Sequence, residues 1–131
     1  MALIQQEFQN DPWKMLVGCI MLNQTSNKQV RQVIYKFFEK YPTPESITED
    51  SIPDITERLR PLGFYNRRAS TILRFSREYI NKENDPKNIS SLYGIGKYAT
   101  DSYEIFINGN TNVEPTDKIL MRYLNGEFIE Q

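Results

Sequence analysis

The chain has 131 residues, of which 16 are basic, 17 are acidic and none is histidine, so its net charge is −1. This length suits a single domain, spanning residues 1–131, that can bury its own core. The near-zero charge excludes a protein coated with basic residues. The single cysteine, Cys19, excludes an internal disulfide and a cysteine-bound zinc or iron–sulfur centre. We expect Cys19, which lies in the apolar run 15–22, to be a small buried side chain.

Nothing in the sequence predicts insertion into a membrane. The apolar run 15–22 is far shorter than the roughly 20 residues needed to cross a bilayer, and no cleavable signal is present at the N-terminus. We expect a soluble, monomeric, intracellular protein, in the nucleus if the source is eukaryotic and in the cytoplasm if it is prokaryotic or viral.

Helical periodicity runs through most of the chain. Asp11–Pro12 predicts a capping residue followed by proline in the first turn. The helix after it, to about Asn23, is apolar on almost every face and is therefore predicted to be central. Apolar residues at helical spacing predict the next helix over 30–41, Thr43–Pro44 starts another, and a further apolar stripe covers 52–62.

The second half of the chain is also predicted to be helical. Asn66 is expected to cap a helix that extends to Ile80 and is broken at 84–86. Shorter helices are predicted, in chain order, at 89–92, at 99–107 and from Pro115–Thr116 through Leu124. Only Thr111–Val113 alternates as a strand would, so the predicted fold class is all-α.

Charged residues are unevenly distributed along the chain. Residues 58–77 contain six arginines and no acid, whereas residues 42–57 contain five acids and no base. The basic block could form a face that follows a phosphate backbone, or it could be an ordinary solvated helix surface. The sequence leaves both interpretations open.

The most informative segment is the pattern Leu92-x-Gly94-Ile95-Gly96 at the start of a predicted helix. Two glycines this close allow a tight turn whose backbone can approach a ligand, and the amides that open the next helix form a site suited to phosphate. A lone carboxylate, Asp117, follows at the start of the last predicted helix. A hairpin that grips a DNA backbone, with one carboxylate at short range, is typical of base excision.

Six blocks of sequence resemble one known family in the same order. They are Leu3-Ile4-Gln5, Asp11-Pro12-Trp13-Lys14, Leu22-Asn23-x-Thr25-Ser26, Pro61-Leu62-Gly63-x-Tyr65, Gly94-Ile95-Gly96-Lys97-Tyr98 and Asp101-Ser102-Tyr103. From Leu3 to about Leu124 the chain resembles the helix-hairpin-helix DNA glycosylase superfamily, and within it the mismatch-specific thymine/uracil glycosylase domain of methyl-CpG-binding-domain proteins. The resemblance implies two helical lobes with the active-site cleft between them. It implies no iron–sulfur cluster, because the four cysteines of some members are absent here.

The resemblance implies that Asp117 is the catalytic carboxylate. It would stabilise the positive charge that builds on deoxyribose as the base departs, and would direct a water to the sugar; the alternative role is a helix cap. Tyr98, the second residue assigned to catalysis, stands where bifunctional members carry the lysine that forms a Schiff base. Tyrosine there implies base release without strand cleavage and a place in the base pocket; the alternative role is a core aromatic.

The remaining site residues are also carried over from the family. Gln5 matches the residue whose amide hydrogen-bonds the flipped pyrimidine, and Gln24 matches the residue that enters the space left by the base. Phe64 matches a second wedge, with core packing as its alternative role. The glycosylase of methyl-CpG-binding-domain proteins has arginine and leucine, respectively, at these last two positions. The residues that hold the DNA backbone in the family correspond to Gly94, Gly96 and Lys97.

The resulting expectation is a monofunctional DNA glycosylase that removes thymine, uracil or a 5-substituted uracil opposite guanine in double-stranded DNA. Cys19 occupies the place of the glutamate with which adenine-removing relatives protonate the purine, so adenine excision is not expected. No catalytic metal or redox cofactor is implied, although hairpin carbonyls often hold a structural monovalent cation in this family. Two alternatives remain: a helix-hairpin-helix module that binds DNA without catalysis, and a glycosylase for alkylated or oxidised bases.

Overall fold

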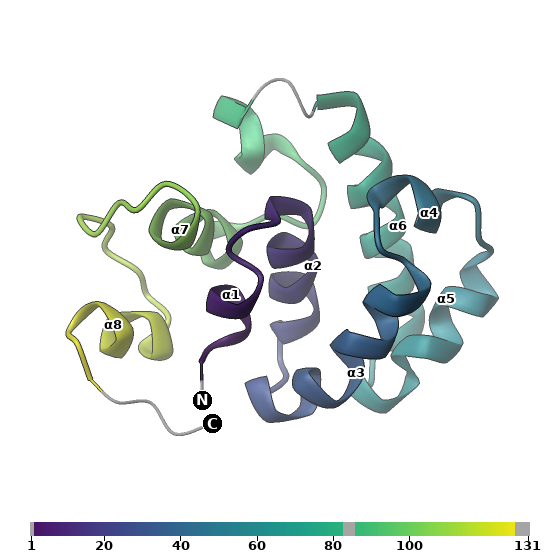
Figure 1. Ribbon diagram of the computed structural model, residues 1–131, viewed down its shortest axis with the longest axis horizontal. Helices are drawn as coiled ribbons and strands as arrows, with labels where there is room; N and C mark the ends of the chain where they lie inside the picture. Colours follow the sequence, from purple (N-terminus) through teal and green to yellow (C-terminus); the bar gives the residue numbers. More distant parts are fainter. Residues whose placement is uncertain (1, 83–85, 128–131) are drawn as a thin grey trace.

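The computed structural model describes residues 2–82 and 86–127, and all regular structure within these ranges is helical (Figure 1). The elements, in chain order, are α1 (Ile4–Glu7), α2 (Pro12–Leu22), α3 (Asn27–Lys40), α4 (Pro44–Thr48), α5 (Ile52–Leu59), the 3-10 turn η1 (Arg60–Leu62), α6 (Tyr65–Lys82), the 3-10 turn η2 (Pro86–Ser91), α7 (Lys97–Phe106) and α8 (Lys118–Leu124). The all-α prediction is therefore confirmed. No helix in the described ranges is both long enough and apolar enough to cross a membrane. Of the predicted helix break at 84–86, residues 84 and 85 lie outside the described ranges.

Helix α2 forms the centre of the protein because it is apolar on nearly every face. Nine of its eleven residues are buried, and it packs against α1, α3, α6 and α7. Its start is the predicted one: Pro12 is the first residue, and the Asp11 carboxylate accepts a hydrogen bond from the Lys14 amide at 3.1 Å. The predicted burial of Cys19 is confirmed, with 2% exposure and its sulfur 3.7 Å from that of Met15.

The helices form two lobes that meet at α1 and α2. In Figure 1, α3 to α6 lie on one side of α1, and α7 and α8 lie on the other. The larger lobe contains most of the core, and a 2.9 Å hydrogen bond from the Trp13 indole to the Ser76 hydroxyl ties α2 to α6. The smaller lobe has a separate cluster of buried side chains, which are Leu3, Ile105, Phe106 and Leu120. The hairpin, residues 92–96, leads from η2 into α7 and lies where the two lobes meet.

Three predicted details of local structure are wrong. Helix α6 already contains Asn66 in its first turn, so Asn66 cannot be its cap. The last helix begins at Lys118, with Asp117 as its N-cap, and not at the proline before it. Residues 111 and 112 form a turn and residue 113 is irregular, so no strand forms there. Hydrogen bonds made by the residues around each boundary decide where a helix begins, and the spacing of apolar residues carries no information about these bonds.

Candidate active site

A pocket of about 450 Å³ lies where α2, α6, the hairpin and α7 meet. Its wall includes six of the residues that the sequence assigned to a site, which are Gln24, Phe64, Gly94, Gly96, Lys97 and Tyr98. These residues come from three separate segments of the chain, and the fold places them around one volume. The volume lies within the range that is usual for small-molecule sites.

Gln24 and Phe64 form the rim of this pocket, and both have a left-handed backbone conformation. Their φ angles are +62° and +45°, and no other residue in the described chain except glycine has a positive φ. This conformation costs about 1–2 kcal/mol for a residue with a side chain, and such strained residues concentrate at functional sites. Phe64 is also 62% exposed. Core packing is therefore excluded as the role of Phe64.

The hairpin needs glycine at position 94 for two reasons. Gly94 has a φ of +82°, and a Cβ added there would lie 2.7 Å from Thr71 Cγ2 on α6. Gly96 differs, because an added Cβ would meet no atom within 4 Å. Gly96 is the N-cap of α7 and has no side chain that could cap the helix. The first amides of α7 have no partner within the helix, and no side chain of residue 96 covers them. The open space beside Gly96 gives a phosphate room to reach the amides.

Below the rim, Tyr98 and Gln5 are joined by a hydrogen bond and form the floor of the site. The Gln5 Nε2 donates to the Tyr98 hydroxyl at 2.7 Å and to the Ser102 hydroxyl at 3.3 Å. Gln5 is 1% exposed and lies behind Tyr98, outside the pocket wall. Its Oε1 is a buried acceptor with no hydrogen-bond partner in the described chain. A buried polar atom of this kind calls for an explanation, and a ligand with a donor group would satisfy it.

Burial raises the pKa of two titratable groups at the floor, Tyr98 and Cys19. It is the main cause that raises the pKa of Tyr98, with smaller contributions from Cys19 and Asp117. It also raises the pKa of Cys19, which lines the pocket, to about 12. A protonated thiol is a poor nucleophile. The floor therefore offers hydrogen bonds and apolar surface, but neither a base nor a nucleophile.

Asp117 lies close to this floor without forming part of the pocket wall. Its Oδ2 accepts a hydrogen bond from the Leu120 amide at 2.9 Å, which makes it the N-cap of α8. The carboxylate is near enough for its charge to raise the pKa of both Tyr98 and Cys19. The cap bond engages one carboxylate oxygen, so the capping role and a catalytic role are compatible.

The Lys97 ammonium points toward the smaller lobe. Its Nζ lies 3.0 Å from Asp101 Oδ2 and donates to the Glu114 carbonyl at 3.1 Å. Lys97 therefore ties α7 to the segment that precedes Asp117. The Lys97 side chain is 53% exposed, so a phosphate can reach it even though its ammonium already makes these two contacts.

Arg68 is a further site residue, which the sequence did not single out from its neighbours. It is 5% exposed, and its Nε donates to the Gly63 carbonyl at 2.9 Å. Its Nη1 donates to the carbonyls of Ile20 and Met21, near the end of α2, at 3.2 and 2.9 Å. Gly63 directly precedes Phe64, and the end of α2 leads into Gln24, so one guanidinium braces the backbone under both rim residues. Nothing in the sequence distinguishes this arginine from the others in its block.

The arginine-rich block does not form a single basic face. Arg60 and Arg74 are each paired with a nearby glutamate, and the guanidinium of Arg74 lies 3.9 Å from the ring centroid of Tyr93 in the hairpin. Arg67 is exposed and lines the pocket beside Arg68. Only part of the block faces the pocket, because helical geometry turns the rest toward solvent or neighbouring side chains.

The fold and the site identify the class of protein. The family model of the HhH-GPD superfamily of base excision DNA repair proteins matches residues 17–125. The chain belongs to this superfamily. Curated relatives include the methyl-CpG-binding domain protein 4-like protein of Arabidopsis thaliana, 38% identical over 122 residues, and the thymine/uracil-DNA glycosylase of Pyrobaculum aerophilum, 30% identical over 124 residues. These matches cover 92% and 90% of this chain, which spans 27% and 53% of the two relatives.

Solved structures share the same fold. A thermostable thymine-DNA glycosylase matches with a TM-score of 0.76 at 26% identity, over 85% of this chain and 53% of that one. A non-covalent complex of endonuclease III with DNA matches with a TM-score of 0.73 at 21% identity, over 91% and 62% of the two chains. The helix-hairpin-helix glycosylase fold that the sequence predicted is confirmed.

Proposed function

We propose that this chain is a monofunctional DNA glycosylase that removes thymine, uracil or a 5-substituted uracil from mispairs with guanine in double-stranded DNA. One observation carries the proposal: an exposed, strained rim, Gln24 and Phe64, lies above a buried polar floor, Tyr98 and Gln5. An enzyme that acts on a base within a duplex must extrude that base into a pocket and fill the gap. Two relatives, the thymine/uracil-DNA glycosylase of Pyrobaculum aerophilum and the thymine-DNA glycosylase of Aeropyrum pernix, support the same substrate class.

The rim residues open the duplex in this proposal. Phe64 stacks against bases beside the gap, and Gln24 enters the space that the extruded base leaves. Their left-handed backbone is already in place in the free protein, so the ordering of these loops costs little on binding. Arg68 keeps both loops in this conformation through its bonds to main-chain carbonyls.

The floor recognises the extruded pyrimidine. Thymine and uracil carry a ring N3–H, which is a donor, whereas N3 of cytosine is an acceptor. The unpaired Oε1 of Gln5 is an acceptor that is buried in the free protein. In this proposal the extruded base reaches it beside Tyr98, which would favour thymine and uracil over cytosine. Tyr98 provides the aromatic wall against which the base lies.

Asp117 provides the negative charge for the reaction. As the bond between base and sugar lengthens, positive charge builds on the deoxyribose, and a nearby carboxylate stabilises it. The same carboxylate orients a water for attack on the anomeric carbon. The amides at the start of α7 hold an adjacent phosphate, with Gly96 leaving the space for it.

The nature of residue 98 supports release of the base without strand cleavage. A Schiff base needs a neutral amine within reach of the sugar, and tyrosine cannot form one. The nearby Lys97 amine is bound to Asp101 and to the Glu114 carbonyl. The expected product is an abasic site in an intact strand.

We also propose that the hairpin carbonyls bind a monovalent cation. The Leu92 and Gly96 carbonyls each accept one internal hydrogen bond, from Ile95 at 3.2 Å and from Thr100 at 2.9 Å. Each carbonyl oxygen keeps a second lone pair, so the turn fits such an ion. The ion would stiffen the hairpin and has no part in the chemistry. We further propose that the protein acts as an intracellular monomer on DNA, in a nucleus or in a prokaryotic cytoplasm.

A panel of duplexes tests this function. Each duplex carries one altered pair: G:T, G:U, guanine opposite a 5-substituted uracil, a normal G:C pair, an alkylated base or an oxidised base. Alkali reveals abasic sites, and borohydride traps any Schiff base. We expect release from the first three duplexes and no trapped adduct. DNA binding without release from any duplex would favour a non-catalytic module, and release of only alkylated or oxidised bases would favour the other glycosylase class.

A further inference from the structure

Helix α1 requires support from the rest of the protein, because it has only four residues and isolated helices this short are not stable in water. It lies between the two lobes and carries Gln5, whose amide reaches Tyr98 and Ser102 on α7. Where α1 lies therefore decides where the Gln5 amide meets a base in the pocket. Helix α1 also packs against α2, and on the side away from α7 its polar contacts are made with α3.

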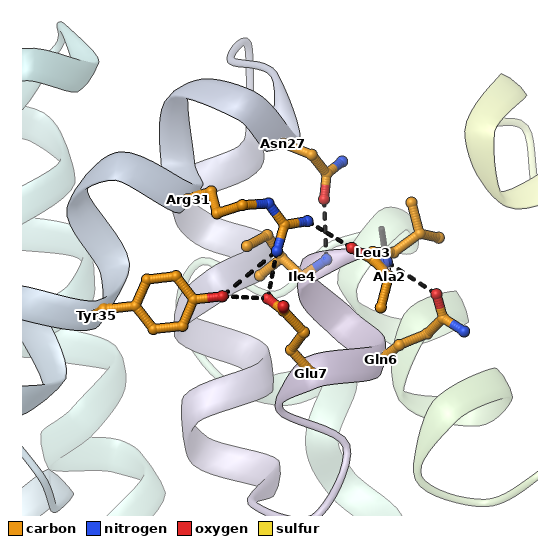
Figure 2. Close-up of polar contacts among 8 residues, drawn as sticks. All are labelled: Ala2, Leu3, Ile4, Gln6, Glu7, Asn27, Arg31 and Tyr35. Atoms are coloured by element: carbon orange, nitrogen blue, oxygen red, sulfur yellow. Dashed lines mark hydrogen bonds and ion pairs between the residues drawn. The ribbon is translucent and has the colours of Figure 1, made fainter. Parts of the chain in front are cut away.

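Three residues of α3 hold both ends of α1, as Figure 2 shows. The Asn27 Oδ1 accepts a hydrogen bond from the Ile4 amide at 2.9 Å, at the start of α1. The Arg31 guanidinium lies 2.5 Å from the Glu7 carboxylate and also donates to the Ala2 carbonyl. The same Glu7 oxygen accepts a 2.6 Å hydrogen bond from the hydroxyl of the third residue, Tyr35.

The three α3 residues share one face, because they are spaced four apart in sequence. The ion pair is partly buried, since the side chains of Arg31 and Glu7 are 12% and 30% exposed, while Tyr35 at its edge is 46% exposed. In addition, the Arg31 Nε is buried with no hydrogen-bond partner in the described chain. An unpaired buried donor costs free energy. The cluster is therefore better suited to fix the position of α1 against α3 than to maximise the stability of the protein.

We propose that Asn27, Arg31, Tyr35 and Glu7 form a clamp that positions the Gln5 amide for the extruded base. None of the described residues of α3 lines the pocket, so the clamp acts from behind the site and through Gln5. These four are positioning residues and touch neither base nor sugar. The inference rests on the proposed function, because Gln5 affects catalysis only if a base enters the pocket.

Single-turnover excision from a G:U duplex, together with duplex affinity, tests the clamp. Arg31→Met removes the guanidinium while keeping an apolar chain of similar length. We expect the excision rate to fall by about 10-fold, since small misplacements of a positioned group are costly, with duplex affinity changed by less than about 2-fold. Arg31→Lys keeps the charge opposite Glu7 and should recover part of the rate. Glu57→Gln is the matched control for the loss of an ion pair: it breaks the exposed Glu57–Arg60 pair on another face and should leave the rate unchanged.

A double-mutant cycle with Gln5→Ala separates positioning from simple stability. If the clamp acts through Gln5, Arg31→Met causes no further loss once the Gln5 amide is gone. An equal fold-loss in both backgrounds, or no loss from Arg31→Met alone, would overturn the clamp. Tyr35→Phe, which removes only one hydroxyl, takes the place of Arg31→Met in the cycle if that variant does not fold. Failure of the wild-type chain to release any base would overturn the proposed function and the clamp together, whereas an active wild type with insensitive variants would overturn the clamp alone.

Discussion

The rim and the floor of the pocket are built by different means. At the rim, Gln24 and Phe64 are exposed, and their places depend on a left-handed backbone braced by a buried arginine. At the floor, Gln5 and Tyr98 depend on side-chain hydrogen bonds between helices. The rim keeps strain in the free protein, whereas the floor loses stability whenever a bond is removed. Substitutions should therefore move stability and activity in opposite directions at the rim and in the same direction at the floor.

The largest expected effect comes from the carboxylate beside the floor. Asp117→Asn keeps an oxygen that can cap α8 but removes the charge that stabilises the sugar cation. We expect single-turnover excision from a G:U duplex to fall by about 10²–10⁴-fold, while a gel-shift measurement finds duplex binding retained. Asp11→Asn is the matched control, because Asp11 caps α2 in the same way. Equal losses from the two variants would assign the effect to helix capping.

The hairpin that joins rim and floor should give the next largest effect. Gly94→Ala has to place a side chain at a φ of +82° and 2.7 Å from Thr71. We expect the free energy of unfolding in urea to fall by about 2–5 kcal/mol, the sum of a left-handed backbone cost and an overpacking cost. Gly109→Ala separates the two costs, since its φ is +69° and a Cβ there meets nothing within 4 Å. Its expected loss is only the backbone part, about 1–2 kcal/mol, and equal losses would show that the Thr71 contact relaxes freely.

A substitution at the rim should reverse the usual relation between stability and activity. Phe64→Gly relieves the left-handed strain at φ +45° and removes an exposed ring. We expect a gain in stability of about 0.5–1 kcal/mol and a loss of about 10-fold in excision, measured by urea unfolding and single-turnover kinetics. The floor variant Tyr98→Phe should instead lose both stability and activity, because it leaves the buried Gln5 amide with one bond fewer. If Phe64→Gly and Tyr98→Phe both lowered stability and activity together, the proposed difference between rim and floor would be wrong.

The smallest expected effect is a dependence of stability on alkaline pH. Burial raises the pKa of Cys19 from 9.0 to about 12, so the thiol ionises first in the unfolded chain. Its contribution to stability is complete below pH 9.0 and is lost as the pH rises toward about 12. Between pH 8 and 9.5 we expect the free energy of unfolding to fall by about 1 kcal/mol, and Cys19→Ala to weaken that slope. Urea unfolding at each pH measures this free energy. A free energy of unfolding that rises between pH 8 and 9.5 would contradict the role given to the buried Cys19 thiol.

Local signals predicted the helix starts well, because caps and prolines act within a few residues. Asp11–Pro12 and Thr43–Pro44 begin α2 and α4 as predicted. The same signals misplaced Asn66, because the left-handed turn at Phe64 already starts α6 before it. Helix α1 was not predicted at all, since four residues carry no periodic pattern. Its existence depends on partners more than twenty residues away in the chain.

The sequence by itself determined the helical class, the glycine hairpin, the lack of a cysteine cluster and, through its resemblance to a family, the residues assigned to the site. Each of these depends on composition or on neighbours close along the chain. Only the tertiary structure decided that Arg68 is buried under the rim, that Lys97 bonds to the Glu114 carbonyl, and that Gln5 donates to Tyr98 across 93 residues of chain. Contacts of that kind exist only once the lobes have packed, because the burial that makes them strong is a property of the assembled core.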